Sequence, residues 1–424
     1  MKKFLIGSAL LSTMLNAQNI TNEDLTKELA EAQVSAPKIA NSGFIPTISL
    51  ILDMSYIYES LDVDTHHVEI PSLVHGGGHS HEGHSHTSLV GNDGFDLNYA
   101  ELSLGATVDN YFDLMSIFHL TEDDFEIEEA FVTTRNLPFY LKGKIGKFKS
   151  DFGYLNKKHH HSYNFADMPL IYSSLLGDHG ITDEGLQLQY VLPTSVYIMA
   201  GVEALRGSNE QSFGYSGFDD IVEDSEYPSL FIGYLKSSFD IGGGTLLAGV
   251  SIANGDSKID HLEDEESPHA FDGETTLYGM DLTYKKYFAS NHSISFTTEY
   301  LYREMLGDRM IPTDIGFNIL DLEKNQGGFY SELVYQYDTN IKAGLRYSEI
   351  SQNDVLINGI NRDVEDDISV SSAMIEYNPS EYSRIRLQYN HNASLYNEDG
   401  RRNDKNAVIV QFTYAIGAHG AHSF

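Results

Sequence analysis

From residue 44 onward, apolar and polar residues alternate with a period of two in one segment after another. In AELSLGATV, for example, Ala100, Leu102 and Leu104 alternate with Glu101 and Ser103. Successive side chains of a β-strand point to opposite faces, so each segment has one apolar and one polar face. Sixteen such segments begin near residues 46, 97, 111, 125, 139, 186, 196, 229, 245, 276, 293, 328, 341, 370, 382 and 407. The chain is therefore predicted to be all-β.

The connections between these segments alternate in length. Those after even-numbered segments are tight, as at Asp109–Asn110 and Pro193–Thr194. Apart from the short Thr121–Asp124, those after odd-numbered segments are long, and they cover residues 61–94, 150–185, 206–227, 255–274, 306–326, 352–368 and 392–405. Strands of about ten residues with short turns on one side and long loops on the other are typical of outer-membrane barrels.

A sheet in lipid cannot leave its edges unpaired, so these strands must close on themselves. The sequence predicts a transmembrane antiparallel β-barrel of about 16 strands. The alternative is one or two soluble β-sandwiches, which would not explain the alternation in connection length.

The N-terminus has the pattern of a secretory signal. Lys2 and Lys3 precede the short apolar run FLIGSALLSTML, and Ala17 suits cleavage. The alternative, a membrane anchor, would need about 20 apolar residues. We expect a signal peptide over residues 1–17, a short and partly helical periplasmic segment over 18–43 and the barrel over 44–424. An even number of strands then places both termini in the periplasm and the long loops outside.

The aromatic residues predict where the barrel meets the lipid head groups. The chain has 27 Tyr and 22 Phe but no Trp, so its interfacial girdles must be built from Tyr and Phe. The girdle candidates near strand ends are Tyr56, Tyr58, Tyr300, Tyr302, Tyr335, Tyr337, Tyr377 and Tyr389. Outer-membrane lipid and lipopolysaccharide are the expected partners, and analogy with porins suggests a homotrimer.

Charge narrows the function further. Asp and Glu total 62 against 27 Lys and Arg, giving a net charge of -35 that repels nucleic acid and attracts cations. The loop stretches 219–226, 260–266 and 363–367 are strongly acidic. The polar faces of the strands supply the expected pore-lining residues Asp53, Glu101, Glu299, Glu332, Arg384 and Arg386. We expect a channel that leans towards cations.

Histidines gather in the first long loop. Residues 75–86 read HGGGHSHEGHSH. Neutral imidazole is the commonest nitrogen ligand of Zn²⁺, Ni²⁺ and Cu²⁺, and a Gly/Ser backbone favours weak, exchangeable capture. The candidate ligands in this loop are His66, His67, His75, His79, His81, His84 and His86. The alternative is a solvated, pH-sensitive loop.

The stretch KKHHHSYNFAD in the loop 150–185 adds His159, His161 and Asp167 as candidate metal ligands. The flanking Lys157 and Lys158 repel cations. The alternative for this loop is therefore a structural one, in which it folds inward and narrows the pore.

The region FGYLNKKHHHSYNFADMPL resembles the family identified as zinc-regulated TonB-dependent outer-membrane receptors. The matching residues are Gly153, Tyr154, Leu155, Asn156, His159, His161, Phe165, Asp167, Pro169 and Leu170. FIPTISLILD, IEEAFV (127–132) and GAHGAHSF also resemble that family. The resemblance implies an outer-membrane barrel linked to zinc limitation. Energised receptors carry a plug and 22 strands, however, and residues 18–43 are too few for a plug.

We therefore expect a passive channel that captures a divalent metal, with zinc favoured over nickel or copper, and that needs no resident cofactor. A general porin with incidental histidines and a TonB-linked receptor are the alternatives. An enzyme is not expected, since no G-x-S-x-G occurs and His119, His292 and His391 stand alone in the sequence.

Overall fold

The computed structural model describes residues 46–60, 66–68, 94–121, 125–209, 211–217, 221–262, 268–288, 291–362, 364, 368–393, 395–397 and 402–417. The predicted signal peptide, the segment 18–43 and the five histidines of residues 75–86 lie outside these ranges.

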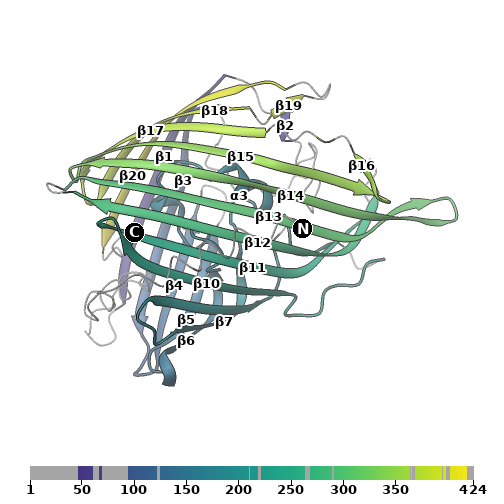
Figure 1. Ribbon diagram of the computed structural model, residues 1–424, viewed down its shortest axis with the longest axis horizontal. Helices are drawn as coiled ribbons and strands as arrows, with labels where there is room; N and C mark the ends of the chain where they lie inside the picture. Colours follow the sequence, from purple (N-terminus) through teal and green to yellow (C-terminus); the bar gives the residue numbers. More distant parts are fainter. Residues whose placement is uncertain are drawn as a thin grey trace. The chain divides into compact units, whose positions relative to one another are not determined.

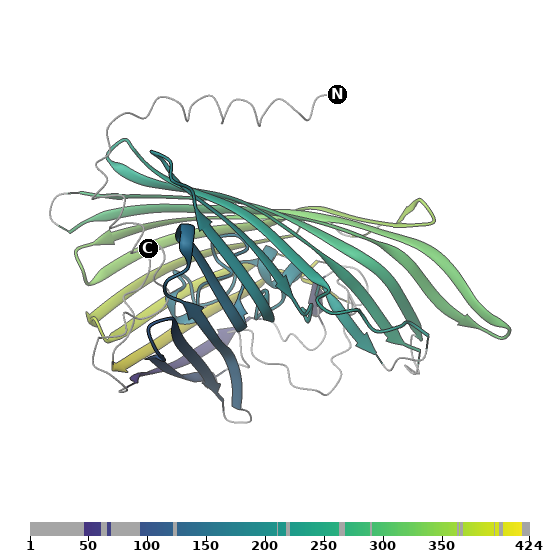
Figure 2. The ribbon, with the colours of Figure 1, turned by 90° about the horizontal axis from the view of Figure 1, so that it is seen from below.

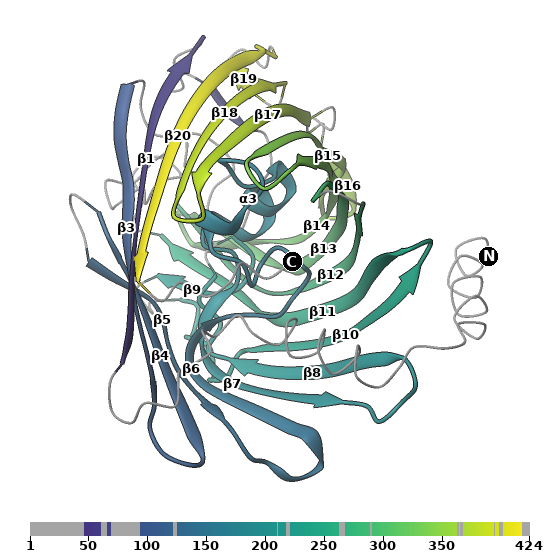
Figure 3. The same cartoon turned by 90° about the vertical axis from the view of Figure 1, so that its left-hand side faces the viewer.

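Within the described ranges, sixteen antiparallel strands form one closed ring (Figures 1 and 3). The last strand of the chain pairs with the first, from Ser49 opposite Gly417 to Glu59 opposite Ala407. The ring consists of β1 (Thr47–Glu59), β3 (Gly94–Thr107), β4 (Phe112–Leu120), β5 (Phe125–Thr134), β6 (Leu141–Lys149), β7 (Thr182–Val191), β8 (Tyr197–Leu205), β10 (Leu230–Ile241), β11 (Gly244–His261), β12 (His269–Tyr287), β13 (Ser293–Thr313), β14 (Gly316–Tyr337), β15 (Ile341–Ile357), β17 (Ile368–Ser380), β18 (Ser383–Asn392) and β20 (Lys405–Gly417).

Each of these strands corresponds to one predicted segment, so the predicted fold class is confirmed. Four further strands are short. β9 (Gly214–Gly217) pairs in parallel with β11, β16 (Ile360–Arg362) pairs with β15, and β2 (His66–Val68) and β19 (Leu395–Asn397) pair with each other in a separate sheet. The helical elements are η3 (Pro138–Tyr140), η4 (His160–Ser162) and α3 (Leu170–Leu176). Among the described residues, no helix is long and apolar enough to cross a membrane.

The strands β11 to β15 are longer than predicted, with 17 to 22 residues each (Figure 2). The predicted long loops 255–274, 306–326 and 352–368 are wrong over much of their length. β13 and β14, for instance, are joined by a tight turn at Asp314 and Ile315. In the extended parts of these strands, polar residues such as Asp308 and Asp321 face outward. In the rest of each strand, the outward-facing residues are mainly apolar. The alternation was therefore hidden, although the inward face still buries Met305 and Leu322.

The outer face of the ring carries the apolar side chains that contact with lipid requires. Outward-facing aliphatic side chains are exposed, including Leu333, Leu345, Ile375 and Leu387. The predicted girdle tyrosines lie on this same outer face, and all except the half-buried Tyr302 are exposed. Halfway along β13 and β12, Tyr302 stacks on Tyr278, with 6.2 Å between ring centroids. A closed ring with an apolar outside bordered by tyrosines is a bacterial outer-membrane barrel.

One glycine offers a test of the strand pairing. Gly146 in β6 has φ +132°, and a Cβ atom there would lie 2.1 Å from the carbonyl oxygen of Ala130. Gly146→Ala is expected to destabilise the barrel by about 3 kcal/mol, since it combines backbone strain with a clash against main chain. The temperature at which the folded band disappears in unboiled gel electrophoresis should fall.

Gly143 provides the matched control on the same strand. A Cβ atom there meets only the side chains of Thr134, at 3.4 Å for the nearest atom, and of Leu137, at 3.8 Å, and no positive φ is involved. Gly143→Ala should leave the transition temperature nearly unchanged. Equal shifts for the two variants would contradict the register of β5 and β6.

Candidate metal centre in the barrel lumen

The segment between β6 and β7, residues 150–181, lies inside the ring and is called the lumen loop here. It contains η4 and α3, and α3 is seen within the ring in Figure 3. α3 packs against β13, β14 and β15. The apolar side chains of the loop are buried; they include Phe152, Phe165, Ile171 and Leu175. The loop therefore packs as an ordered part of the barrel interior.

The acidic residues predicted to line the pore hold this loop from one side. Glu299 on β13 accepts hydrogen bonds from the backbone N–H groups of Tyr154 and Leu155, at 2.8 and 2.9 Å. It also accepts one from the hydroxyl of Tyr172, at 2.8 Å. Glu332 on β14 accepts one from the side chain of Asn164 at 3.0 Å. Both carboxylates are buried beneath the loop.

The predicted arginines hold the loop from β18. Arg384 donates a hydrogen bond to the carbonyl of His161, and Arg386 donates one to the carbonyl of Tyr163, both at 2.7 Å. Arg386 is also paired with Glu376 at 2.7 Å. Asp53 on β1 is fully buried and accepts a hydrogen bond from Thr413 at 2.7 Å. The six predicted pore-lining side chains thus face inward, and five of them contact the lumen loop, the fifth being Glu101 through His161.

Asp167 has partners of its own. Its carboxylate pairs with Arg346 and accepts hydrogen bonds from Gln388 at 2.6 Å and Asn390 at 2.8 Å. The structure therefore gives this predicted metal ligand a role in fixing the loop to β15 and β18, apart from the histidines.

Three histidines and three glutamates meet where η4 approaches β3, β4 and β5. They are Glu101, His119, Glu128, Glu129, His159 and His161. Strand alternation alone would turn only one of Glu128 and Glu129 inward. A β-bulge on β5 changes this: Ile117 pairs with Glu129 and Phe118 with Ile127, so Glu128 is the extra residue. Bulges re-aim side chains, and here both glutamates are buried.

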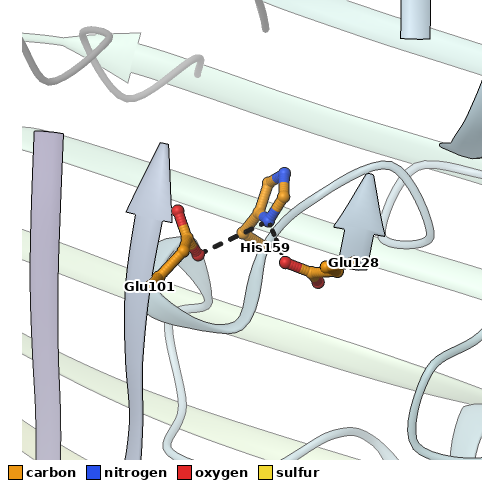
Figure 4. A group of neighbouring side chains, drawn as sticks. All are labelled: Glu101, Glu128 and His159. Atoms are coloured by element: carbon orange, nitrogen blue, oxygen red, sulfur yellow. Dashed lines mark hydrogen bonds and ion pairs between the residues drawn. The ribbon is translucent and has the colours of Figure 1, made fainter. Parts of the chain in front are cut away.

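Five donor atoms of this cluster point towards one another. Glu128 Oε2 lies 2.8 Å from His119 Nε2 and 3.0 Å from His159 Nδ1. Glu101 Oε2 lies 3.1 Å from His161 Nδ1, 3.5 Å from His119 Nε2 and 3.6 Å from His159 Nδ1. Figure 4 shows Glu101, Glu128 and His159, each with one donor atom within 4.8 Å of the others.

Atoms of these side chains that do not point into the cluster contact other residues around it. Lys149 Nζ lies 3.1 Å from Glu128 Oε1, and the hydroxyl of Ser103 donates to Glu101 Oε1 at 3.2 Å. Glu129 Oε2 lies 3.0 Å from His159 Nε2. The ring of His119 stacks on Tyr99 with 4.7 Å between centroids. Four of the five donor atoms are therefore presented by side chains that are fixed at a second point.

The electrostatics of the cluster call for added positive charge. Three buried carboxylates face the single ammonium group of Lys149, which leaves two negative charges to be balanced. Buried charges are costly unless they are paired. Burial lowers the pKa of His159, but the carboxylates of Glu128 and Glu101 outweigh burial and raise it well above the ordinary value. Either protons on the imidazoles or a divalent cation can supply the missing charge.

The donor set fits Zn²⁺. Zinc takes imidazole nitrogen and carboxylate oxygen at about 2.0–2.2 Å, so tetrahedral donors stand about 3.4 Å apart. The donor atoms around Glu101 Oε2 are already at 3.1 to 3.6 Å. His119 Nε2 also forms no hydrogen bond of regular geometry despite its close carboxylates. Ni²⁺ and Cu²⁺ accept the same donor types, whereas Mg²⁺ and Ca²⁺ prefer oxygen alone.

The lysines that precede the histidines turn away from the cluster. Lys158 Nζ lies over the ring of Tyr154, 3.8 Å from its centroid. Burial and the neighbouring Lys236 lower the pKa of Lys157 to about 8, with Asp151 acting in the opposite direction. The expected repulsion of a cation by these lysines is therefore directed at another part of the lumen.

Sequence reasoning found part of this centre. His159 and His161 were predicted as ligands, and Glu101 was predicted only as a pore-lining residue. His119, Glu128 and Glu129 were missed, although IEEAFV, which contains both glutamates, was among the stretches that resemble the zinc-regulated family. His66 and His67 lie in β2, which pairs with β19 in a separate two-stranded sheet.

Comparison with known proteins finds a relative by sequence and several solved structures with a similar fold. No family model matches the chain. A protein of Aquifex aeolicus (strain VF5), described as uncharacterized, is 43% identical over 403 residues, which cover 94% of this chain and 83% of that protein. The outer-membrane channel DcaP of Acinetobacter baumannii has a TM-score of 0.51 at 14% identity, over 90% of this chain and 100% of DcaP. OmpT of Vibrio cholerae, in a trimer form, has a TM-score of 0.50 at 12% identity, over 88% of this chain and 99% of OmpT.

Proposed function

Because the chain belongs to the same family as the Aquifex aeolicus protein and has the fold of outer-membrane porins, we propose that it is a passive channel for divalent metal ions, with zinc favoured. The observation that carries the proposal is the convergence of three histidines and two glutamates on one point in the lumen, beside the loop that occupies the barrel. A general porin has no need of such a buried donor set.

The route begins at the long-loop end, which the sequence predicts to face outward. There the acidic loops concentrate cations, and the predicted capture by the histidines of residues 75–86 is weak and exchangeable. Within the barrel the ion exchanges onto the site formed by Glu101, Glu128 and His159 with His119 and His161. Permeation requires that the site bind firmly enough to select the ion and loosely enough to release it.

Diffusion is favoured over energised uptake. A TonB-driven receptor has 22 strands around a plug, whereas the ring here has sixteen strands with the lumen loop inside. The proposal includes a link to zinc limitation, which the resemblance to the zinc-regulated family implies.

The proposed channel is a homotrimer in contact with lipopolysaccharide. The trimer form of the similar Vibrio cholerae barrel supports the homotrimer.

Single-channel recording in planar bilayers tests the proposal. We expect Zn²⁺ added to a KCl solution to interrupt the current of the purified protein, because an ion held in the lumen obstructs the path of K⁺. Ca²⁺ at the same concentration should have little effect, since imidazole nitrogen is a poor ligand for it.

The matched control is the full chain with all five histidines of residues 75–86 replaced by asparagine. Interruption by Zn²⁺ should persist in this variant at somewhat higher concentration, because the lumen site is intact. A current that is indifferent to Zn²⁺ in the unaltered protein would favour the general porin instead.

A further inference from the structure

We propose that Glu129 is a positioning residue of the lumen site, whose carboxylate fixes the ring of His159 so that Nδ1 is the nitrogen offered to the metal. The inference rests on the proposed function and deepens it, because it assigns the tautomer on which binding depends. Neither the predicted strand alternation nor the predicted ligands pointed to this residue.

The geometry places the two ring nitrogens of His159 in different surroundings. Nε2 lies 3.0 Å from Glu129 Oε2. Nδ1 lies 3.0 Å from Glu128 Oε2 and 3.6 Å from Glu101 Oε2, among the converging donor atoms. A neutral imidazole carries one N–H group and one lone pair. If Nε2–H donates to Glu129, the lone pair is on Nδ1 and faces the metal position.

Glu129 is itself fixed, so it cannot readily become a ligand. Its second oxygen, Oε1, accepts a hydrogen bond from the backbone N–H of Lys149 at 2.7 Å. The side chain is buried, and the β-bulge at Glu128 turns it inward. Both oxygens of Glu129 are thus engaged behind His159, whereas Glu101 and Glu128 each direct one oxygen into the cluster.

Lys149 contacts both Glu129 and the proposed ligand Glu128. Its backbone N–H holds Glu129, and its ammonium group lies 3.1 Å from Glu128 Oε1. It is the last residue of β6 and leads into the lumen loop that carries His159. The support for the imidazole is therefore built into the strand end from which the loop starts.

Replacing Glu129 by glutamine changes the hydrogen bonding without changing the volume. A glutamine has only one oxygen. If that oxygen accepts the Lys149 N–H, the amide NH₂ faces His159 Nε2 and requires the lone pair there. The proton of the imidazole then moves to Nδ1, where it blocks the metal. Partners of this kind typically affect metal affinity about 10- to 100-fold.

The experiment measures Zn²⁺ binding by isothermal titration calorimetry, in full-length protein with the histidines of residues 75–86 replaced by asparagine. Four proteins are compared: this background, Glu129→Gln, His159→Ala and the double variant. We expect Glu129→Gln to weaken binding about 10- to 100-fold with one ion still bound. In the His159→Ala background, which retains His119, His161, Glu101 and Glu128, Glu129→Gln should have no further effect.

The outcomes separate the inference from the proposed function. Unchanged affinity in Glu129→Gln would overturn the positioning role and leave the metal site standing. An equal loss with and without His159 would also overturn it, because Glu129 would then act by another route. If the background protein binds no Zn²⁺ at all, the proposed function itself fails.

Discussion

Replacing Glu101 and Glu128 together by glutamine is expected to lower the affinity of the lumen site for Zn²⁺ by at least about 100-fold. The change removes the two charged oxygens on which the three histidines converge. Loss of an outer partner already costs about 10- to 100-fold, so the loss of two direct ligands costs more. Isothermal titration calorimetry measures the affinity in the background protein, in which the histidines of residues 75–86 are replaced by asparagine. In the double variant, Zn²⁺ should no longer interrupt the single-channel current.

Glu332→Gln is the matched control, because Glu332 is also a buried, inward-facing carboxylate at the lumen loop but lies on β14. It should bind Zn²⁺ as the background does. Folding of each variant is checked by the shift of the unboiled band in gel electrophoresis, and the single variant Glu101→Gln serves if the double one does not fold. Undiminished binding in a folded double variant would exclude the cluster as the metal site.

Replacing Glu299 by alanine is expected to free the lumen loop and raise the conductance. Glu299 accepts hydrogen bonds from two backbone N–H groups of the loop and from the hydroxyl of Tyr172. Hydrogen bonds to a charged group contribute roughly 1.5–3 kcal/mol each, so losing the two from the backbone N–H groups alone costs at least about 3 kcal/mol. The population with a detached loop should rise about 100-fold. Single-channel records should then show frequent transitions to a more conductive level.

Asp281→Ala is the control for this prediction. Asp281 lies directly opposite Glu299 on β12 and also faces the lumen, but its Oδ1 has no hydrogen-bond partner in the described part of the chain. Its removal should change ion selectivity more than the frequency of large openings. If both variants behave as the unaltered channel, the loop is held mainly by Arg346, Arg384 and Arg386.

The fold could be predicted because a strand exposed to lipid on one side must alternate at every second residue. The same rule explains the failures. Beyond the tyrosine girdle the outer face carries Asp308 and Asp321, so the strands around them were predicted as loops. At Glu128 the bulge breaks the period, and a rule that assigns alternate residues to opposite faces cannot place two consecutive glutamates inside.

The candidate site was less accessible to sequence reasoning because it is assembled from distant segments. His119 stands alone in its strand and becomes part of a cluster only when β4 pairs with β5 and the lumen loop folds back. The histidines of the loop could be found because three stand together. The glutamates that contact these histidines could be identified only from the register of β4 and β5. That register includes a β-bulge that no local sequence pattern predicts.

The unequal strand lengths have a consequence for how a solute arrives. β4, β5 and β6, with 9 or 10 residues each, stand across the ring from β13 and β14, with 21 and 22. The rim is therefore lowest where Glu128 and His119 are found, and β3, which pairs with β1 on one side, pairs with β4 of this low side on the other. An ion that enters over the low side descends past fewer residues before reaching the donors than one entering over the high side. The difference in strand length thus makes the wall at β13 and β14 the taller one, and the shorter path to the donor atoms runs over β4, β5 and β6.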